Sequence, residues 1–278
     1  MATVQQLLQE AKTLPGDSGR RDAEILLCHT LDKPRSYLYS WPESEPSPRQ
    51  QSIFLELLAQ RRDGQPVAYL IGEREFWSLS LTVDEHTLIP RPETETLVSW
   101  ALELALPDHA DVLDLGTGSG AIALALASER PDWQVTAADR SEGAVEIAAG
   151  NASRLALGNV HCLLSDWFGA VAGFQFDLLV SNPPYIEEDD PHLQRGDLRF
   201  EPVSALAAGP DGLGDLRVLA GQAPAHLNPG GWLLLEHGYQ QGDAVRELLR
   251  EAGFGAVTTR NDLSGHPRIT GGCLHADG

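Results

Sequence analysis

Apolar side chains along residues 1 to about 72 recur every three or four positions, which is the spacing of amphipathic helices. A possible capping box at Thr3–Gln6 opens the first predicted helix, and the second ends near Lys33–Pro34. The third begins at Ser47–Pro48, with proline at its first helical position, and stops at Asp63–Gly64. Because these apolar stripes can bury one another, we predict a small helical bundle without chemistry of its own.

The pattern then changes to the alternation of strands between Gly72 and Val83, which predicts a hairpin. From about residue 88, apolar runs of strand length alternate with helical stretches. The predicted strands are 111–115, 134–138, 159–164, 176–180 and 231–235, and the predicted helices are 93–106, 120–128, 141–156, 213–227 and 239–252. This alternation indicates a mostly parallel sheet with helices on both faces.

The chain therefore reads as an α/β fold in three parts. We predict a helical domain at 1–72, a hairpin linker at 73–87 and a larger α/β domain at 88–278. The tail at 255–259 and 269–275 supplies a closing antiparallel pair of strands.

Composition narrows the class of protein. With 278 residues, 42% of them hydrophobic, the chain can bury a sizeable core, while its formal charge of −20 argues against bulk attraction to nucleic acid. The cysteines, Cys28, Cys162 and Cys273, form no Cys-x-x-Cys pair, which favours reduced thiols and argues against a disulfide framework or a metal site. We see no signal-peptide pattern and no apolar run of membrane-spanning length, so we expect a cytoplasmic protein. We also expect a monomer.

The most informative stretch is the apolar run Phe176–Ser181, which ends in Asn182, Pro183, Pro184 and Tyr185. Proline has no N–H and a fixed φ, so the two prolines stop the strand and hold the preceding carbonyls rigidly. The Asn182 side chain adds an acceptor and Tyr185 a flat face. Together they can grip a planar –NH2 group, although Pro-Pro alone more often marks a stiff turn.

A glycine-rich loop follows the strand that contains Asp114. The loop consists of Gly116, Thr117, Gly118, Ser119 and Gly120. Glycines allow a close approach to a ligand, and open α/β sheets bind ligands at the carboxyl ends of their strands. Asp139 ends the next strand, where a carboxylate suits ribose hydroxyls. The loop alone could be a tight turn, but the loop with this spaced acid favours a nucleoside cofactor.

Charge indicates which cofactor binds. The pyrophosphate of a dinucleotide would be repelled by Asp114, whereas S-adenosylmethionine carries a cationic ammonium and sulfonium that this acid attracts. Asp166 and Trp167 follow the third strand, where an acid can accept from the adenine amino group and an aromatic can flank the ring. This set of residues predicts a methyltransferase.

These motifs resemble those of the glutamine-N5 methyltransferases that modify bacterial peptide chain release factors. The similarity runs nearly end to end and covers Ala68–Glu73, Phe76–Trp77, Leu88–Glu95, Asp114–Gly120, Asp139, Asp166–Trp167, Asn182–Tyr185 and Arg199–Pro202. The Asn-Pro-Pro-Tyr motif also occurs in adenine-N6 and cytosine-N4 methyltransferases. Pro90–Glu95 is more telling, because it resembles the release-factor branch rather than the sister enzymes that methylate a ribosomal protein.

The resemblance implies a helical substrate-recognition domain, a hairpin linker and a seven-stranded, Rossmann-like class I methyltransferase domain. It implies transfer from S-adenosylmethionine, with S-adenosylhomocysteine as product, to the glutamine of the Gly-Gly-Gln loop of class 1 release factors, which supports translation termination. Asn182 Oδ1 and the Pro183 carbonyl would each accept one amide hydrogen, with Tyr185 packed on the amide and Pro184 beside it. Arg91 and Glu201 are candidates for shaping the entrance of the substrate loop, although solvated charges are the usual alternative.

Three rival readings remain at this point. The first is an amino-methyltransferase of adenine N6 in nucleic acid, which the charge of −20 disfavours. The second is a non-catalytic module that binds S-adenosylmethionine and a partner protein, which the intact Asn182 motif disfavours. The third is a nicotinamide oxidoreductase, which Asp114 disfavours.

Overall fold

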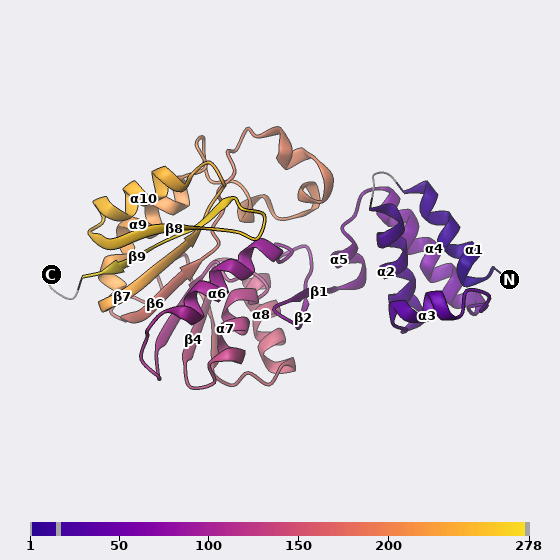
Figure 1. Ribbon diagram of the computed structural model, residues 1–278, viewed down its shortest axis with the longest axis horizontal. Coiled ribbons are helices and arrows are strands. Elements are labelled where there is room, and N and C mark those ends of the chain that lie inside the picture. The colour runs from indigo at the N-terminus through magenta and orange to yellow at the C-terminus, as the bar shows by residue number, and fades with distance from the viewer. Residues whose placement is uncertain (1, 15–17, 276–278) are drawn as a thin grey trace. The chain divides into compact units, whose positions relative to one another are not determined.

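A computed structural model describes residues 2–14 and 18–275 (Figure 1). The chain divides into two compact units. The first unit holds the chain as far as Glu73 together with Arg195–Phe200, and the second holds Arg74–Gln194 and the chain from Glu201 onward. In this part of the chain, every helix is too short or too polar to cross a membrane.

The first unit is helical. Its elements are α1 (Val4–Gln9), η1 (Glu10–Thr13), α2 (Gly19–Leu31), α3 (Arg35–Ser40), α4 (Pro48–Arg62), α5 (Val67–Ile71) and η4 (Gly196–Phe200). The predicted capping box is present at Thr3–Gln6, and the structure shows a second one at Ser47–Gln50, where side chain and backbone likewise bond reciprocally. Leu26, Leu27 and Phe54 are fully buried in its core, so this unit buries its own apolar stripes as predicted.

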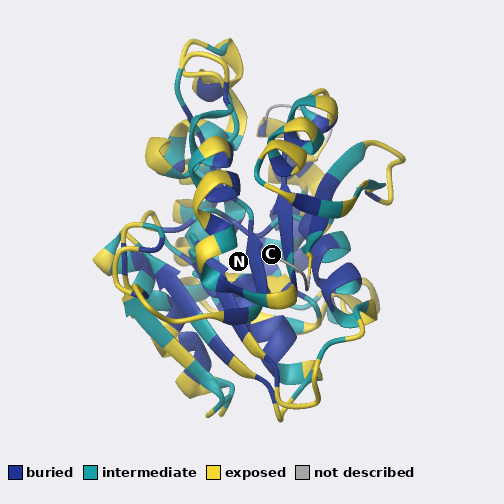
Figure 2. Cartoon of the chain, turned by 90° about the vertical axis from the view of Figure 1, so that its left-hand side faces the viewer, coloured by how far each residue is buried: buried dark blue, intermediate teal, exposed yellow. Residues whose placement is uncertain are grey.

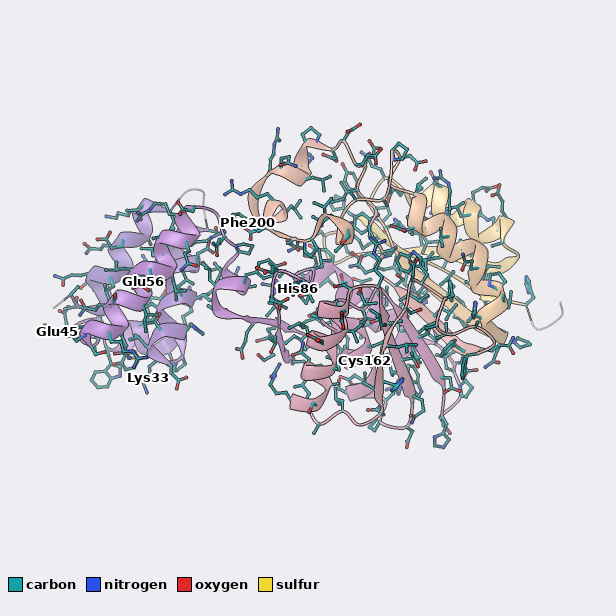
Figure 3. The ribbon with its side chains drawn as sticks, turned by 180° about the vertical axis from the view of Figure 1, so that it is seen from behind. Lys33, Glu45, Glu56, His86, Cys162 and Phe200 are labelled. Carbon is teal, nitrogen blue, oxygen red and sulfur yellow. The ribbon has the colours of Figure 1, made fainter. Side chains whose placement is uncertain are left out.

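Arg195–Phe200 joins this unit through polar contacts rather than through the apolar core. Arg61 binds Asp197 at 2.8 Å, and Arg199 donates to the carbonyl of Asp63 at 2.6 Å. Phe200, labelled in Figure 3, ends the segment. No sequence pattern predicted that six residues from so late in the chain would group with the first unit.

The predicted hairpin consists of β1 (Glu73–Phe76) and β2 (Leu79–Thr82). Trp77 and Ser78 both have positive φ, 51° and 60°, which is the backbone of the tight two-residue turns that match the twist of paired strands. Asn151 of α8 (Glu142–Arg154) accepts from the Thr82 N–H at 2.8 Å and donates to its carbonyl at 3.0 Å, which fastens β2 to α8 within the second unit.

The second unit is built on a seven-stranded sheet with the order β5-β4-β3-β6-β7-β9-β8. The strands are β3 (Asp111–Leu115), β4 (Gln134–Asp139), β5 (Val160–Leu164), β6 (Phe176–Ser181), β7 (Leu227–Glu236), β8 (Phe254–Asn261) and β9 (Pro267–Leu274). The strands from β3 to β7 pair in parallel, and β9 runs antiparallel to β7 and β8. The predicted α/β fold and its antiparallel tail are confirmed.

Helices cover both faces of this sheet (Figure 1). The described helices of this unit are η2 (Pro92–Thr94), α6 (Glu95–Glu103), α7 (Ala121–Glu129), α8 (Glu142–Arg154), η3 (Pro191–Gln194), η5 (Val203–Ala205), α9 (Gly214–Gln222), η6 (Ala223–His226) and α10 (Gly242–Glu251), and the longer ones supply the cover. Val112 packs in the core under α6 and α7, whereas Leu113 packs in the core under α9 and α10. Figure 2 shows the resulting dark blue interior strands. Alternate residues of a strand therefore enter opposite cores.

One predicted boundary is wrong. The helix expected at 213–227 ends at Gln222, a short turn of 3-10 helix follows, and β7 begins at Leu227 instead of residue 231. Pro224 cannot continue the α-helical hydrogen bonding, and Leu227 instead pairs with Phe176 of β6. Tertiary pairing thus extended a strand into a stretch that looks helical in sequence.

Candidate active site

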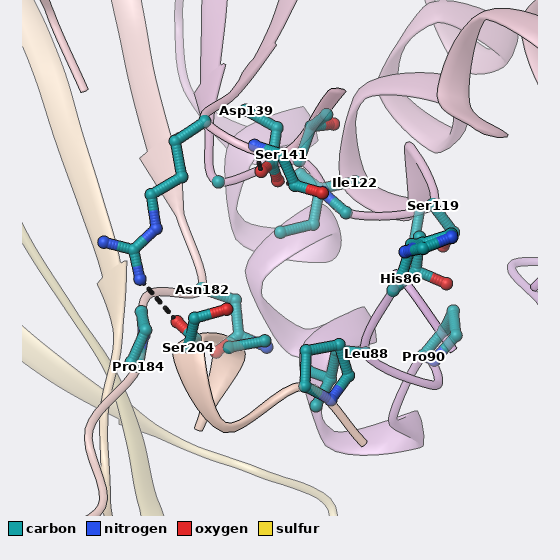
Figure 4. A pocket seen from close by; sticks show the side chains of 18 of the residues that line it. His86, Leu88, Pro90, Ser119, Ile122, Asp139, Ser141, Asn182, Pro184 and Ser204 are labelled. Carbon is teal, nitrogen blue, oxygen red and sulfur yellow. Dashed lines mark hydrogen bonds between the residues drawn. The ribbon is translucent and has the colours of Figure 1, made fainter. Parts of the chain in front are cut away.

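The site lies at the topological switch point of the sheet. β3 has β4 on one side and β6 on the other, so the chain leaves the carboxyl ends of β3 and its neighbours in opposite directions. A crevice forms between those connections at the carboxyl ends of the strands. Asp139 and Asn182 come from the ends of β4 and β6, on the two sides of that crevice (Figure 4). The pocket there has a volume of about 930 Å³ with its open mouth included.

Most of the predicted site residues line this one pocket. They are Arg91, Gly116, Thr117, Gly118, Ser119, Asp139, Asp166, Trp167, Asn182 and Pro184. The other predicted residues do not line it: Asp114, Gly120, Pro183, Tyr185 and Glu201. Predicted residues from the ends of four strands therefore meet in one pocket.

The glycine-rich loop adopts backbone that favours glycine. Gly116 and Gly118 have φ of 74° and 55°, in the left-handed region that costs other residues strain. A Cβ built on Gly116 would lie 3.4 Å from the Trp167 ring, which is about van der Waals contact. The loop therefore passes directly beside the ring, and it is the positive φ that favours glycine here.

Asp139 organises the loop as well as lining the pocket. Its Oδ2 accepts from the Gly118 N–H at 2.9 Å, and its Oδ1 accepts from the Ser141 N–H at 2.9 Å. Each carboxylate oxygen can accept a further bond, so these contacts orient the group without using all of its acceptor capacity. Asp139 is thus preset by backbone donors at the pocket edge.

Asp114 lies beneath the loop and is fully buried. Its Oδ2 accepts from Thr117 Oγ1 at 2.6 Å and from the Ala123 N–H at 3.2 Å, while Oδ1 has no hydrogen-bond partner among the described residues. Burial raises the pKa of this carboxyl to about 7, against the opposing effect of those two bonds. A cationic ligand would stabilise the charged form.

The Asn182 amide has a defined orientation. Its Nδ2 donates to Thr94 Oγ1 at 3.2 Å, and Thr94 is itself buried at the start of α6. The described part of the chain supplies no donor to Asn182 Oδ1 or to the Pro183 carbonyl. Two acceptors of the predicted motif are therefore left unoccupied, as gripping an –NH2 group requires.

Tyr185 points away from the pocket lining toward β7. Its hydroxyl donates to Glu236 Oε1 at 3.3 Å, and its carbonyl accepts from Gln241 Nε2 at 3.0 Å. Burial, then the neighbouring Glu236 charge, raise the pKa of Tyr185, so its hydroxyl stays a donor at neutral pH. One bond thus holds the ring through its hydroxyl, and the other holds the backbone of Tyr185.

Arg91 and Glu201 bind one another. Arg91 Nη2 lies 2.5 Å from Glu201 Oε1, and the Ile89 N–H donates to Oε2 at 3.1 Å. The Glu201 side chain is fully buried, so it anchors Arg91 at the pocket rim. The roles predicted for the two residues at the substrate entrance stay predictions. The ion pair gives Arg91 a fixed position from which it could act.

Several lining or neighbouring residues carried no prediction of a role. His86, Thr94, Arg140, Ser141 and Ser204 line the pocket, and Arg140 donates to the Ser204 carbonyl at 2.9 Å (Figure 4). His86 is exposed on the segment before η2, as Figure 3 shows. Glu236 could have been singled out from the sequence, because it ends the apolar run of β7 as Asp139 ends that of β4.

Comparison with protein families divides the chain at nearly the same place as the two compact units. Residues 2–72 match the model described as the PrmC N-terminal domain. Residues 94–196 match the model described as the methyltransferase small domain, which contains the glycine-rich loop and the Asn182 motif.

Solved structures agree on the fold. A methyltransferase from Pyrococcus furiosus aligns with a TM-score of 0.55 at 19% identity, covering 82% of this chain and 100% of its own. The 16S rRNA N2 G1207 methyltransferase of T. thermophilus aligns with a TM-score of 0.51 at 22% identity, covering 73% and 50%. At these identities the similarity concerns the fold alone, and it confirms the class I methyltransferase architecture.

Relatives of nearly equal length are much closer. The release factor glutamine methyltransferase of Pseudomonas aeruginosa is 55% identical over 270 residues, which cover 97% of this chain and 98% of that protein. The protein of the same name from Vibrio cholerae is 54% identical, covering 97% and 93%, and that of Escherichia coli is 52% identical, covering 91% and 92%. These matches confirm the resemblance seen in the motifs, and this chain belongs to the family of release factor glutamine methyltransferases.

Proposed function

We propose that this protein transfers a methyl group from S-adenosylmethionine to the side-chain nitrogen N5 of the glutamine in the Gly-Gly-Gln loop of class 1 release factors. One observation carries the proposal: Thr94 holds Asn182 Nδ2, which leaves Oδ1 as an acceptor in the pocket that the glycine-rich loop also lines. The names of the relatives support a release factor as the substrate. The modification would serve translation termination.

The residues of the pocket fit S-adenosylmethionine. Buried Asp114 Oδ1 has no partner in the described chain, and a carboxylate so placed favours a cationic ligand over an anionic pyrophosphate. Asp139 would hold the ribose hydroxyls, Asp166 the adenine amino group, and Trp167 one face of the adenine. When bound, S-adenosylmethionine supplies a methyl group on a positively charged sulfur.

The protein's part in the reaction is to position the amide and stabilise its developing charge. An amide nitrogen is a weak nucleophile because its lone pair is delocalised into the carbonyl. With Asn182 Oδ1 and the Pro183 carbonyl each accepting one of its hydrogens, the nitrogen is held in place and positive charge on it is stabilised. As the new N–C bond forms, the bond between the methyl carbon and the sulfur would break and its electron pair would stay on the sulfur, giving S-adenosylhomocysteine. The nitrogen then releases one proton to water, so no strong base is required.

We also assign recognition of the protein substrate to the first unit. It has a core of its own, and those of its residues that the structure describes do not line the pocket. A chain that begins at Gly72 should still bind S-adenosylmethionine in calorimetry but lose most activity on an intact release factor. Full activity of that shortened chain would contradict the assignment.

The central test is tandem mass spectrometry of a release factor incubated with the protein and S-adenosylmethionine. We expect one added methyl group on the loop glutamine, and none when that glutamine is replaced by asparagine. The shorter side chain withdraws the nitrogen by over about 1 Å, which costs about a hundredfold in rate. Methyl found on adenine in added DNA, with none on the protein, would instead support the nucleic-acid reading.

A further inference from the structure

His86 brings an imidazole ring to the pocket from the segment that precedes the parallel sheet. The residue lines the pocket and is exposed. Its backbone N–H donates to Asp84 Oδ1 at 2.9 Å, whereas its two ring nitrogens have no hydrogen-bond partner among the described residues. A neutral imidazole carries one donor and one acceptor, so the ring can offer both to a ligand.

Helix α8 carries the segment that leads to His86. Arg154, the last residue of this helix, donates to the Ser80 carbonyl, and the Asn151 side chain bonds both backbone groups of Thr82. As the chain advances from Ser80 to Thr82, it therefore moves back along α8 toward the first turn of the helix. The contacts of His86 continue in that direction.

Gly143, in the first turn of α8, allows the His86 ring to come close to the helix. A Cβ built on Gly143 would lie 2.7 Å from His86 Cγ and 3.0 Å from its Cβ and Cδ2. Carbon atoms in contact lie about 3.5–4.0 Å apart, so the ring fills the space that a side chain at position 143 would need. Gly143 has helical backbone without a positive φ, and the close approach is thus what requires glycine here.

This contact places the ring beside the residues expected to hold ribose. Asp139 ends β4, and Ser141 caps α8, its hydroxyl accepting from the Ala144 N–H at 3.3 Å. Both of these residues and His86 line the pocket (Figure 4). The ring thus stands at the start of α8, one helical turn after the carboxylate of Asp139.

Asp139 and His86 have complementary hydrogen-bonding groups. An ionised carboxylate can only accept, so Asp139 would take hydrogens from ribose hydroxyls. A hydroxyl that gives its hydrogen to Asp139 still has an oxygen that can accept, and binding takes this oxygen away from water. An acceptor left without a donor at a buried site is costly. The ring N–H of His86 can supply that donor.

We propose that His86 is a cofactor-binding residue: its imidazole donates a hydrogen bond to a ribose hydroxyl that Asp139 also holds, and Gly143 positions the ring. The inference rests on the proposed function, because it takes S-adenosylmethionine as the cofactor. It adds to the ribose site a donor that comes from the segment before the sheet rather than from a strand end.

Calorimetry with S-adenosylhomocysteine measures this contact without any methyl transfer. His86→Ala should lower the affinity about threefold to tenfold, as expected for the loss of one uncharged hydrogen bond. The loss should disappear with either the 2′-deoxy or the 3′-deoxy form of the ligand, because the hydroxyl that accepts from His86 is then absent. Glu85→Ala, a change of the neighbouring exposed residue outside the pocket lining, is the control and should bind as the wild type does. Wild-type affinity in His86→Ala, or an equal loss with all three ligands, would overturn the proposal.

Two glycines of α8 provide a matched pair of variants. Gly143→Ala puts a methyl group where the ring lies, so it should weaken binding about as much as His86→Ala. The double variant should bind no more weakly than His86→Ala alone, because Gly143 acts through the ring. Gly150→Ala adds a Cβ that meets nothing within 4 Å, and should leave the affinity unchanged. Equal affinities of Gly143→Ala and the wild type would refute the role of Gly143 in positioning the ring.

NMR spectra of the histidine rings separate this inference from the proposed function. The His86 ring signals, assigned by their loss in His86→Ala, should shift when S-adenosylhomocysteine is added. They should already be shifted in free Gly143→Ala but not in free Gly150→Ala. If the wild type binds the ligand and these signals stay unmoved, the inference alone is refuted.

The same ligand also tests the cofactor and the substrate. A wild-type protein that binds no S-adenosylhomocysteine would refute the proposed cofactor and this inference with it. Binding that depends on His86, in a protein that leaves release factors unmethylated, would retain the inference and reject the proposed substrate.

Discussion

The two sides of the pocket are assembled in different ways. On the side of β3 and β4, contacts run mostly through backbone: the N–H groups of Gly118 and Ser141 bond Asp139, and that of Gly116 bonds the Ala138 carbonyl at 2.8 Å. On the side of β6 and β7, contacts run through side chains: Asn182 bonds Thr94 and Tyr185 bonds Glu236.

The difference predicts how each side responds to substitution. The backbone contacts on the side of β3 and β4 form a cradle, and most changes of side chain leave it intact as long as its glycines allow the backbone conformation. The side-chain bonds on the side of β6 and β7 have no such tolerance, because each hydroxyl or amide has a fixed number of donors and acceptors. We therefore expect substitutions on the cradle side to change binding, and substitutions on the side of β6 and β7 to change turnover.

Asn182→Ala is the most severe test of the side of β6 and β7. It removes one of the two acceptors proposed for the substrate amide and should lower kcat about a hundredfold or more, on the scale of a lost oxyanion-hole contact. Affinity for S-adenosylmethionine should change little in calorimetry. Asn228→Ala is the control, because Asn228 bonds Asp177 at 2.8 Å near the start of β7, away from the pocket. Normal single-turnover rates in Asn182→Ala would remove this residue from the chemistry.

Asp139→Ala tests the cradle side. The carboxylate is proposed to hold ribose hydroxyls by charge-assisted bonds of about 1.5–3 kcal/mol each, so affinity for S-adenosylmethionine should fall at least about tenfold. Since two backbone N–H groups also lose their acceptor, the melting temperature of the free protein should fall as well.

Asp177→Ala separates these two effects. Asp177 also accepts two bonds, from the Asp111 N–H at 2.9 Å and from Asn228 at 2.8 Å, but it does not line the pocket. Its loss should lower the melting temperature and leave affinity unchanged. Equal affinities for Asp139→Ala and the wild type would show that Asp139 serves only the loop.

The same contrast explains what could be predicted from sequence. The loop, Asp139 and the Asn182 motif are contiguous or lie at strand ends, so their position on a parallel sheet follows from the alternation of strands and helices. The bond between Thr94 and Asn182 joins residues 88 positions apart, and that between Tyr185 and Glu236 joins residues 51 apart. Periodicity does not encode such pairings, and it likewise gave no sign that Arg195–Phe200 would join the first unit.

Binding should depend on pH through Asp114. Its pKa is raised to about 7, chiefly by burial, and the cationic cofactor is expected to bind the deprotonated form. Affinity for S-adenosylmethionine should thus be constant above about pH 7 and fall by up to about tenfold per unit below it. Calorimetry between pH 5.5 and 8.5, in buffers of matched ionic strength, measures this directly.

Asp114→Asn tests whether Asp114 is the group that titrates. In the free protein, burial favours the neutral carboxyl of Asp114 over the charged one. The carboxyl's contribution to the free energy of unfolding is therefore complete below the unfolded pKa of 3.8 and is lost as pH rises through about 7. The asparagine variant should therefore bind weakly at every pH, and its stability should fall less than that of the wild type between pH 5 and 8. An unchanged pH profile of affinity in the variant would assign the titration to another group.

Trp167 should show the smallest effect, because it contributes a face rather than a charge. Its backbone φ of 46° is left-handed, and its ring lies against Gly116, so the loop fixes the ring before any ligand binds. Aromatic contacts of this kind contribute about 0.5–1.5 kcal/mol beyond area burial, which predicts about a two- to tenfold loss of affinity in Trp167→Leu. Trp167→Phe keeps a π face and should stay within about twofold of the wild type, and kcat at saturating cofactor should be unchanged in both. If instead kcat falls with affinity intact, Trp167 acts on the substrate side, and the division between a binding side and a catalytic side does not hold at this wall of the pocket.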